Sequence, residues 1–223
     1  MQRTQARMTQ ALEIVVTAPI VSFRNPLYAG VQVGLPCPPP STVGGFLAAA
    51  VGGWDQVPET TRFAMTFRAE GTGVDLETYH PLGSPGTPTN ITIKDREFLA
   101  HTTLTMWLIE NLDMWQQALR RPVWPLRLGR SQDLVAVKTG RTDLVSRSGV
   151  QGHAVIPQEI PGAAGTPMRL TTAISDDRAR KRWGSYCYAA QGAAVQVDTG
   201  LATQTGQAIA LLPSTHPAQF ATA

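Results

Sequence analysis

A proline-bounded stretch near the start of the chain has the residue types that bind phosphate. Residues 38–40 are all proline, and Ser41 or Thr42 then offers a hydroxyl that caps a helix by accepting a hydrogen bond from an orphan backbone N–H. Apolar residues at helical spacing predict a helix over residues 41–52, where glycines end it. A helix start of this kind, with Arg24 in the segment before it, is a suitable cradle for a phosphate group.

Gly44 and Gly45 lie in the first turns of this predicted helix, where each costs up to about 1 kcal/mol relative to alanine. Glycine is tolerated where another backbone or a ligand must approach closely. Because glycine in a helix more often serves the packing of a neighbouring element, the local sequence favours packing over phosphate binding.

A second group with chemical potential flanks residues 80–90, which contain three prolines and two glycines and predict a protruding loop. Tyr79, His80 and Lys94 adjoin this loop, and RNA cleavage without metal needs only a base for the 2′-hydroxyl and an acid or cation for the leaving group. The favoured alternative is that Tyr79 packs, His80 is solvated and Lys94 contacts phosphate, because a lone histidine has no organising partner here.

Several classes of protein are excluded by what the sequence lacks. None of the four histidines has a second histidine, a cysteine or an acid at metal-ligand spacing, and we expect no metal and no cofactor. Walker loops, dinucleotide fingerprints and nucleophile elbows are missing as well. No run of about 18 apolar residues and no cleavable leader is found, so we expect a cytoplasmic protein without a membrane segment. Two cysteines do not make a disulfide framework.

The distribution of charge is more informative than the net charge of +3. Basic residues gather between residues 120 and 147, where only Asp133 and Asp143 oppose them, and again at 178–182. The second cluster is followed by Trp183 and two tyrosines. Basic surfaces with aromatic neighbours suit nucleic acid, although a solvated charged face is the alternative for either run.

The predicted elements place these groups in an α+β protein. Strands are expected at 12–18, 62–68, 74–79, 91–98, 104–109 and 123–130. Helices are expected at 41–52 and from Asn111 or Asp113 to Arg121. The resulting order over residues 11–130 is typical of a ferredoxin-like core, which many RNA-recognition domains share. Trp107 and Trp124 lie in apolar runs and are expected in the core.

The chain is expected to have two parts. Residues 1–145 form the core, and residues 146–223 form a small antiparallel β lobe with a frayed tail from residue 213. Within this lobe, short apolar runs between glycine- and proline-rich turns predict strands at 154–156, 168–174, 193–197 and 208–212.

Three segments in this order resemble CRISPR-associated protein family five. Residues 23–26 (FRNP) with 38–47 (PPPSTVGGFL) resemble the opening motif of that family. Residues 96–99 (REFL) and 122–130 (PVWPLRLGR) resemble two later motifs. Three ordered motifs are far more specific than any one of them, and the resemblance fades beyond about residue 145.

The resemblance implies a subunit of a type I CRISPR surveillance complex (Cascade), with a ferredoxin-like core and a protruding thumb at about residues 80–95. Such a subunit caps the 5′ handle of the CRISPR RNA, contacts the large subunit and the first backbone subunit, and meets target DNA only through the complex. One branch of the family cleaves precursor RNA with Tyr, Lys and His. Here Asp95 follows Lys94 and no adjacent Lys-His pair exists, so we expect no enzyme. A metal-independent endoribonuclease that processes precursor CRISPR RNA is the alternative.

The resemblance also makes phosphate binding at the helix start more expected than packing alone. The RNA-binding residues that it implies, with Lys94 and Arg96 supporting the thumb, are Arg24, Tyr28, Ser41, Thr42, Gly44, Gly45, Lys94, Arg96, Arg127, Gly129, Arg130 and Arg141. We expect the helix start to converge in space with Arg24, Arg127 and Arg130. Arginines in such a place read base edges as well as phosphates of single-stranded RNA.

Overall fold

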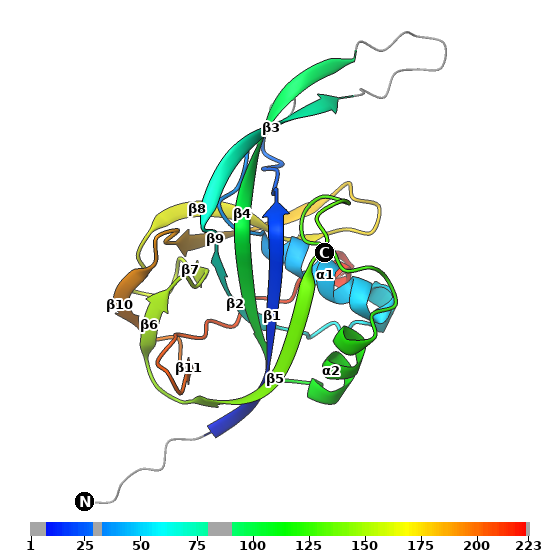
Figure 1. Ribbon diagram of the computed structural model, residues 1–223. Coiled ribbons are helices and arrows are strands. Elements are labelled where there is room, and N and C mark those ends of the chain that lie inside the picture. Colours follow the sequence, from blue (N-terminus) through cyan, green and yellow to red (C-terminus); the bar gives the residue numbers. More distant parts are fainter. Residues whose placement is uncertain (1–7, 29–32, 80–90, 222–223) are drawn as a thin grey trace, which may run out of the picture.

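A curved antiparallel sheet forms the framework of the protein (Figure 1). The computed structural model describes residues 8–28, 33–79 and 91–221. The sheet has the strand order β11-β5-β1-β4-β2, and β3 pairs with β4 off this path. Its strands are β1 (Met8–Val21), β2 (Phe63–Arg68), β3 (Gly71–Tyr79), β4 (Thr92–Leu108), β5 (Ala136–Val145) and β11 (Ala202–Thr203). The α+β class expected from the sequence is confirmed.

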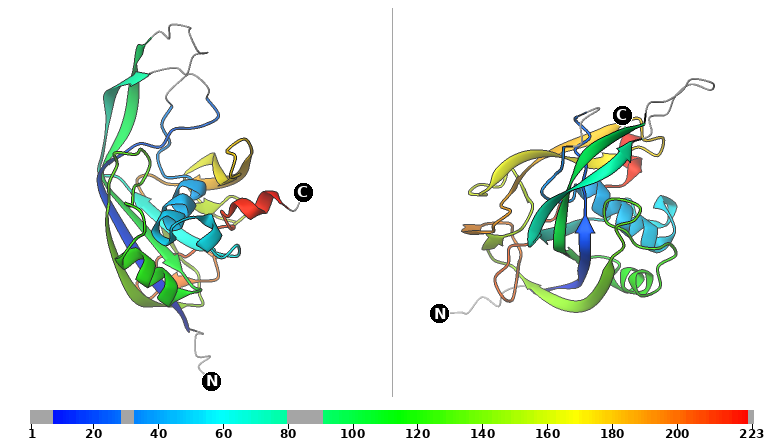
Figure 2. Two further views of the ribbon diagram at one scale, coloured as in Figure 1. Left: turned by 90° about the vertical axis from the view of Figure 1, so that its right-hand side faces the viewer. Right: turned by 45° about the horizontal axis from the view of Figure 1, so that its top comes forward.

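One face of the sheet is apolar and is covered by two helices, α1 (Pro40–Val51) and α2 (Leu112–Arg120) (Figure 2). Successive side chains of a strand point to opposite faces, so alternate residues build this face. They come from three neighbouring strands and are Leu12, Ile14, Val16, Phe63, Met65, Phe67, Leu104, Met106 and Leu108. Together with Phe46 and Leu47 of α1 they form one buried core.

Helix α1 occupies the predicted range, and Gly52 ends it in the left-handed conformation at φ +96° as expected. The predicted cap is wrong. Pro39 stands at the N-cap position and no side chain caps the helix. Proline suits the first helical position because its φ is already helical and its missing N–H would have been unpaired there. Ser41 is instead buried, with its Oγ 2.7 Å from Oγ1 of Thr171.

Strands β2, β3 and β4 form one long, interrupted hairpin. Two separate strands were expected at 91–98 and 104–109, but β4 is a single strand of 17 residues. The register of β4 is the same on β2, where Arg68 pairs with Thr103, as on β3, where Gly71 pairs with Ala100. The outer part of this hairpin projects from the body of the protein (Figure 1). Of the predicted thumb, residues 80–90 lie outside the described residues, and residues 92–95 belong to this hairpin.

The strand expected at 123–130 is not present. This segment makes only an isolated bridge between Arg127 and Leu134, and the sheet is completed instead by β5 on the other side of β1. Pro125 removes a donor from the segment, and Gly129 turns the backbone with φ +104°. Strand β5 escaped prediction because its exposed Lys138 and Gly140 interrupt the apolar pattern.

The rest of the chain folds into two small antiparallel sheets beside the main one. They consist of β6 (Gly149–Gly152) with β10 (Ala193–Val197), and of β7 (Ile156–Pro157), β9 (Lys181–Tyr188) and β8 (Thr166–Ile174). Strand β9 was not predicted. The strand expected at 208–212 forms only an isolated bridge at Ala208 within these residues. The N–H of Val155 donates to the carbonyl of Met65 at 3.2 Å, so the segment just before β7 contacts β2.

Two further expectations fail. Trp124 is 59% exposed, whereas Trp107 is in the core as expected. The tail expected to fray from residue 213 is ordered to residue 221: Thr215 is buried, His216 Nε2 lies 3.0 Å from the carbonyl of Trp54, and a short 3-10 helix, η2, spans Pro217–Phe220. No helix in the described part of the chain is long and apolar enough to span a membrane.

Candidate nucleic-acid interface

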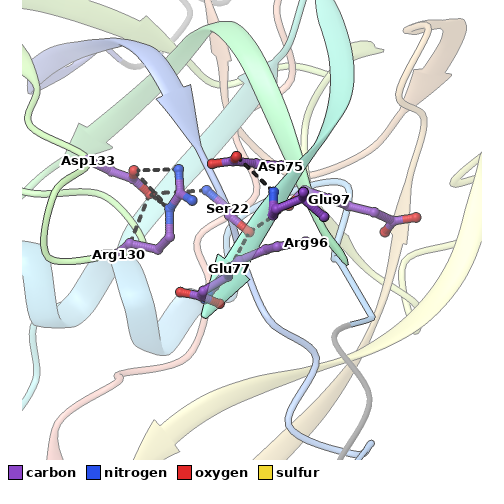
Figure 3. Close-up of polar contacts among 8 residues, drawn as sticks. Ser22, Asp75, Glu77, Arg96, Glu97, Arg130 and Asp133 are labelled. Atoms are coloured by element: carbon purple, nitrogen blue, oxygen red, sulfur yellow. Dashed lines mark hydrogen bonds and ion pairs between the residues drawn. The ribbon is translucent and has the colours of Figure 1, made fainter. Parts of the chain in front are cut away.

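Ser22, directly after β1, is the residue at which distant segments of the chain meet (Figure 3). Its backbone N–H donates to Oδ2 of Asp133 at 3.2 Å. Its hydroxyl donates to the carbonyl of Glu97 at 2.7 Å and accepts from Nε of Arg96 at 3.1 Å. Ser22 therefore joins the end of β1 to the protruding hairpin and to the loop that contains Asp133.

Arg130 and Arg96, both expected to bind RNA, use their guanidinium groups inside the protein. Arg130 makes an ion pair with Asp133 at 3.0 Å, with side-chain exposures of only 10% and 2%. Arg96 pairs with Glu77 across the hairpin, and its side chain is 15% exposed. A charge is buried only when it is paired, so these two arginines hold the segments together.

Gly129 belongs to the same junction. A Cβ atom there would lie 2.7 Å from the carbonyl oxygen of Ser22, and the φ of +104° is in the left-handed region that favours glycine. Gly129 therefore serves a close approach of two backbones within the protein. All three motifs of the family resemblance contribute residues on or next to this junction.

Arg24 and Arg127 differ from the arginines above. Both are exposed, and within the described residues no hydrogen bond or ion pair involves either guanidinium. Arg24 follows Ser22 by two residues and bridges Gly34 through its backbone, while Arg127 bridges Leu134. The junction thus presents two unpaired cations on segments that it holds in place.

Three further predicted residues lie elsewhere. Arg141, on β5, donates to Asp113 and Gln116 of α2. Tyr28 is 51% exposed. Lys94 is half-buried on the projecting hairpin, directly opposite Glu77 in the register.

The start of α1 is built differently from the predicted cradle. Pro40 has no N–H, and the amides of Thr42 and Val43 both donate to the carbonyl of Pro39 at 2.9 and 3.3 Å. Few orphan donors remain for an anion. Gly44 packs inside, because a Cβ there would lie 2.0 Å from Oγ1 of Thr215. A Cβ at Gly45 would meet nothing within 4 Å. The packing explanation, which the local sequence favoured, therefore holds for Gly44 but not for Gly45.

The expected convergence is found only in part. Arg24 and Arg130 lie on segments that share Ser22, but within the described residues no hydrogen bond or ion pair joins the start of α1 to either of them or to Arg127. Ser41 contacts Thr171 instead. Sequence reasoning missed Ser22 and Asp133, and the only available signal was an acid three residues from an arginine in a basic stretch.

The residues considered for RNA cleavage do not form a described site. His80 lies outside the described residues, and so does the side chain of Tyr79. The described residues contain no group of three or more His, Cys, Asp and Glu that could hold a metal ion. Tyr186 and Tyr188 of β9 are buried, and burial raises the pKa of both phenols, so neither offers a face for base stacking.

Comparison with known proteins gives the family. The family model described as CRISPR-associated protein (Cas_Cas5) matches residues 11–180. A solved chain titled CRISPR RNA-guided surveillance complex aligns with a TM-score of 0.53 at 18% identity, covering 94% of this chain and 92% of that chain. A CRISPR protein from Archaeoglobus fulgidus aligns with a TM-score of 0.50 at 13% identity, covering 92% and 99%. At such low sequence identity, these two alignments show a shared fold alone. The comparison with curated proteins finds no relative. With 170 residues matched by the family model, the chain belongs to the CRISPR-associated protein (Cas_Cas5) family.

Proposed function

We propose that this protein is a non-catalytic subunit of a type I CRISPR surveillance complex (Cascade). It binds and caps the 5′ handle of the CRISPR RNA and joins the large subunit to the backbone, and the complex then binds target DNA through its guide. The observation that carries this proposal is the family match over residues 11–180. A solved relative of the same fold comes from a CRISPR RNA-guided surveillance complex, which supports the same assembly for this chain.

The sheet supports a ferredoxin-like core as part of the proposal. The order β5-β1-β4-β2, with α1 between β1 and β2 and α2 between β4 and β5, agrees with the strand and helix order of that fold. The outer part of the hairpin formed by β3 and β4 is then the thumb. The contacts of Ser22 with Arg96 and with the carbonyl of Glu97 support its position relative to the core.

Within this proposal, Arg24 and Arg127 contact the RNA, while Arg96 and Arg130 position the segments that carry them. The planar guanidinium group forms forked contacts with phosphate and stacks on bases, which suits a splayed single strand. Exposed, unpaired arginines bind such a ligand without breaking an internal ion pair. The absence of an adjacent Lys-His pair near Lys94 is the reason for proposing a non-catalytic role.

Co-purification tests the proposal. The complex is assembled with wild-type protein or with Arg24→Ala/Arg127→Ala, and the CRISPR RNA content and nuclease protection of its 5′ handle are measured. We expect the double variant to retain less RNA and to leave the handle exposed. The matched control is Arg120→Ala/Arg121→Ala, which removes the same charge from an exposed site at the end of α2. Full RNA content and handle protection in the Arg24→Ala/Arg127→Ala complex contradict the assigned contacts.

A further inference from the structure

A pocket of about 460 Å³ lies at the start of α1, where the helix faces the turn between β8 and β9 and the C-terminal segment. Its lining includes Ser41, Gly45, Arg178, Lys181 and Thr215. None of these residues takes part in the junction at Ser22. The pocket is therefore separate from the interface of Arg24 and Arg127.

Two cations of the pocket have no internal partner. Arg178 and Lys181 are exposed, and within the described residues no hydrogen bond or ion pair involves their side-chain nitrogens. The neighbouring arginines do have internal partners: Arg180 lies over the ring of Phe220, and Arg182 donates to Gln219. The lining has one carboxylate, that of Asp176, so the cations outnumber it two to one. The balance favours an anionic ligand.

Thr215 supplies an unpaired donor in the same pocket. The residue is 5% exposed, and its hydroxyl has no hydrogen-bond partner among the described residues. The Oγ1 atom keeps access to solvent at the pocket wall, so it can donate to a ligand there. The other hydroxyl of the wall, that of Ser41, is already paired with Thr171.

Gly45 and Arg178 have backbone features that packing does not explain. A glycine in a helix costs up to about 1 kcal/mol relative to alanine, yet nothing lies within 4 Å of a Cβ built at Gly45. The bare backbone leaves the pocket open to a ligand. Arg178 has φ +60°, a left-handed conformation in which Gly or Asn is preferred. The geometry of the turn therefore does not explain an arginine at this position.

We propose that this pocket binds a phosphate group of single-stranded RNA through Arg178, Lys181 and the hydroxyl of Thr215. The inference rests on the proposed function and extends it, because it adds a second anchoring point for the handle. This point lies on the C-terminal part of the chain, beyond the three motifs at residues 23–130. Single-stranded RNA crossing the protein is then held at two places, the junction at Ser22 and the start of α1.

Binding of a fluorescently labelled single-stranded RNA with the repeat-derived 5′ handle tests this inference on the full chain. We expect Arg178→Ser/Lys181→Ser to weaken binding about tenfold or more at 100 mM salt and to lower the slope of log K against log salt by about 0.7, the value for one lost phosphate contact on a single strand. The matched control Arg120→Ser/Arg121→Ser keeps the wild-type affinity.

A second variant separates a binding defect from a folding defect. Gly45→Ala should raise the midpoint of thermal unfolding, because alanine favours the helix, and should weaken RNA binding by narrowing the pocket. Gly44→Ala should lower that midpoint, because its methyl group collides with Thr215.

The outcomes distinguish the two proposals. The pocket proposal alone is overturned if Arg178→Ser/Lys181→Ser and Gly45→Ala both bind handle RNA with wild-type affinity while Arg24→Ala/Arg127→Ala binds it more weakly. No binding of handle RNA by the wild type overturns the proposed function, and the pocket with it. In a parallel arm, inorganic phosphate is tested for thermal stabilisation. Stabilisation that Arg178→Ser/Lys181→Ser abolishes, combined with unchanged RNA affinity, shows a small-anion site and contradicts an RNA site.

Discussion

The guanidinium of Arg130 makes a two-point contact with the carboxylate of Asp133, with Nη2 3.0 Å from Oδ1 and Nε 3.2 Å from Oδ2. The same carboxylate accepts the backbone N–H groups of Arg130 and Ser22. An arginine from the last of the three motif segments is therefore part of the framework. Its ion pair holds the loop at residues 127–133 against the end of β1.

Removing Asp133 tests this assignment. Asp133→Ala leaves the nearly buried guanidinium of Arg130 and the N–H of Ser22 without their acceptor, so we expect a loss of about 3–5 kcal/mol in the free energy of unfolding. Urea unfolding followed by tryptophan fluorescence measures it. The control Asp55→Ala removes an exposed carboxylate and should stay within about 0.5 kcal/mol of wild type. Equal stability of the two variants contradicts a structural role for the pair.

The exposed arginines should behave in the opposite way. Arg24→Ala and Arg127→Ala should each leave the unfolding free energy within about 0.5 kcal/mol of wild type, because neither side chain has an internal partner among the described residues. Each should lower the slope of log K against log salt for handle RNA by about 0.7. Fluorescence anisotropy over a salt series measures the slope. If either variant loses stability and leaves the salt slope unchanged, Arg24 and Arg127 are structural residues and not RNA contacts.

Gly129 and Gly140 form a matched pair of glycines. Gly129→Ala places a methyl group 2.7 Å from the carbonyl oxygen of Ser22 at a φ of +104°, and we expect it to cost about 1–3 kcal/mol. Gly140→Ala meets nothing within 4 Å and should not lower stability. Thermal unfolding of both variants measures the difference. A midpoint for Gly129→Ala equal to that of Gly140→Ala contradicts a required close approach of the backbone at residue 129 to Ser22.

A non-catalytic subunit should leave repeat RNA intact. Incubating the purified protein with end-labelled precursor repeat RNA in EDTA should give no product above the buffer control, analysed on a sequencing gel. Lys94→Ala should behave as the wild type does. Sequence-specific cleavage that Lys94→Ala abolishes establishes the endoribonuclease alternative.

The Cys37 thiol should make stability depend on pH in the alkaline range. Burial raises the pKa of the Cys37 thiol well above its usual range, so the folded protein keeps the thiol neutral. In the unfolded chain the thiol ionises at about pH 8.5. The stabilisation is complete below that pH and is lost as the pH rises above it, because only the unfolded state then releases a proton. Comparing urea unfolding of wild type and Cys37→Ala from pH 7 to 10 should show a steeper alkaline loss for wild type, and parallel curves contradict this.

Local patterns in the sequence predicted much of the framework. The alternation of Phe63, Met65 and Phe67 located β2, and the prolines before Ser41 with Gly52 after it located α1. Prediction failed where a pattern was interrupted without a change of structure. Strand β4 was divided in two, and β5 was missed because Lys138 and Gly140 face outward.

The sequence by itself determined the family, the α+β class and the positions of the arginines. The tertiary structure decided which arginines remain unpaired, because a side chain is paired or exposed according to neighbours that are far away in the chain. Ser22 and Asp133 meet across 111 residues, and no local spacing encodes that contact. The same reason separates Gly44 from Gly45: Thr215 closes over the first and leaves the second open.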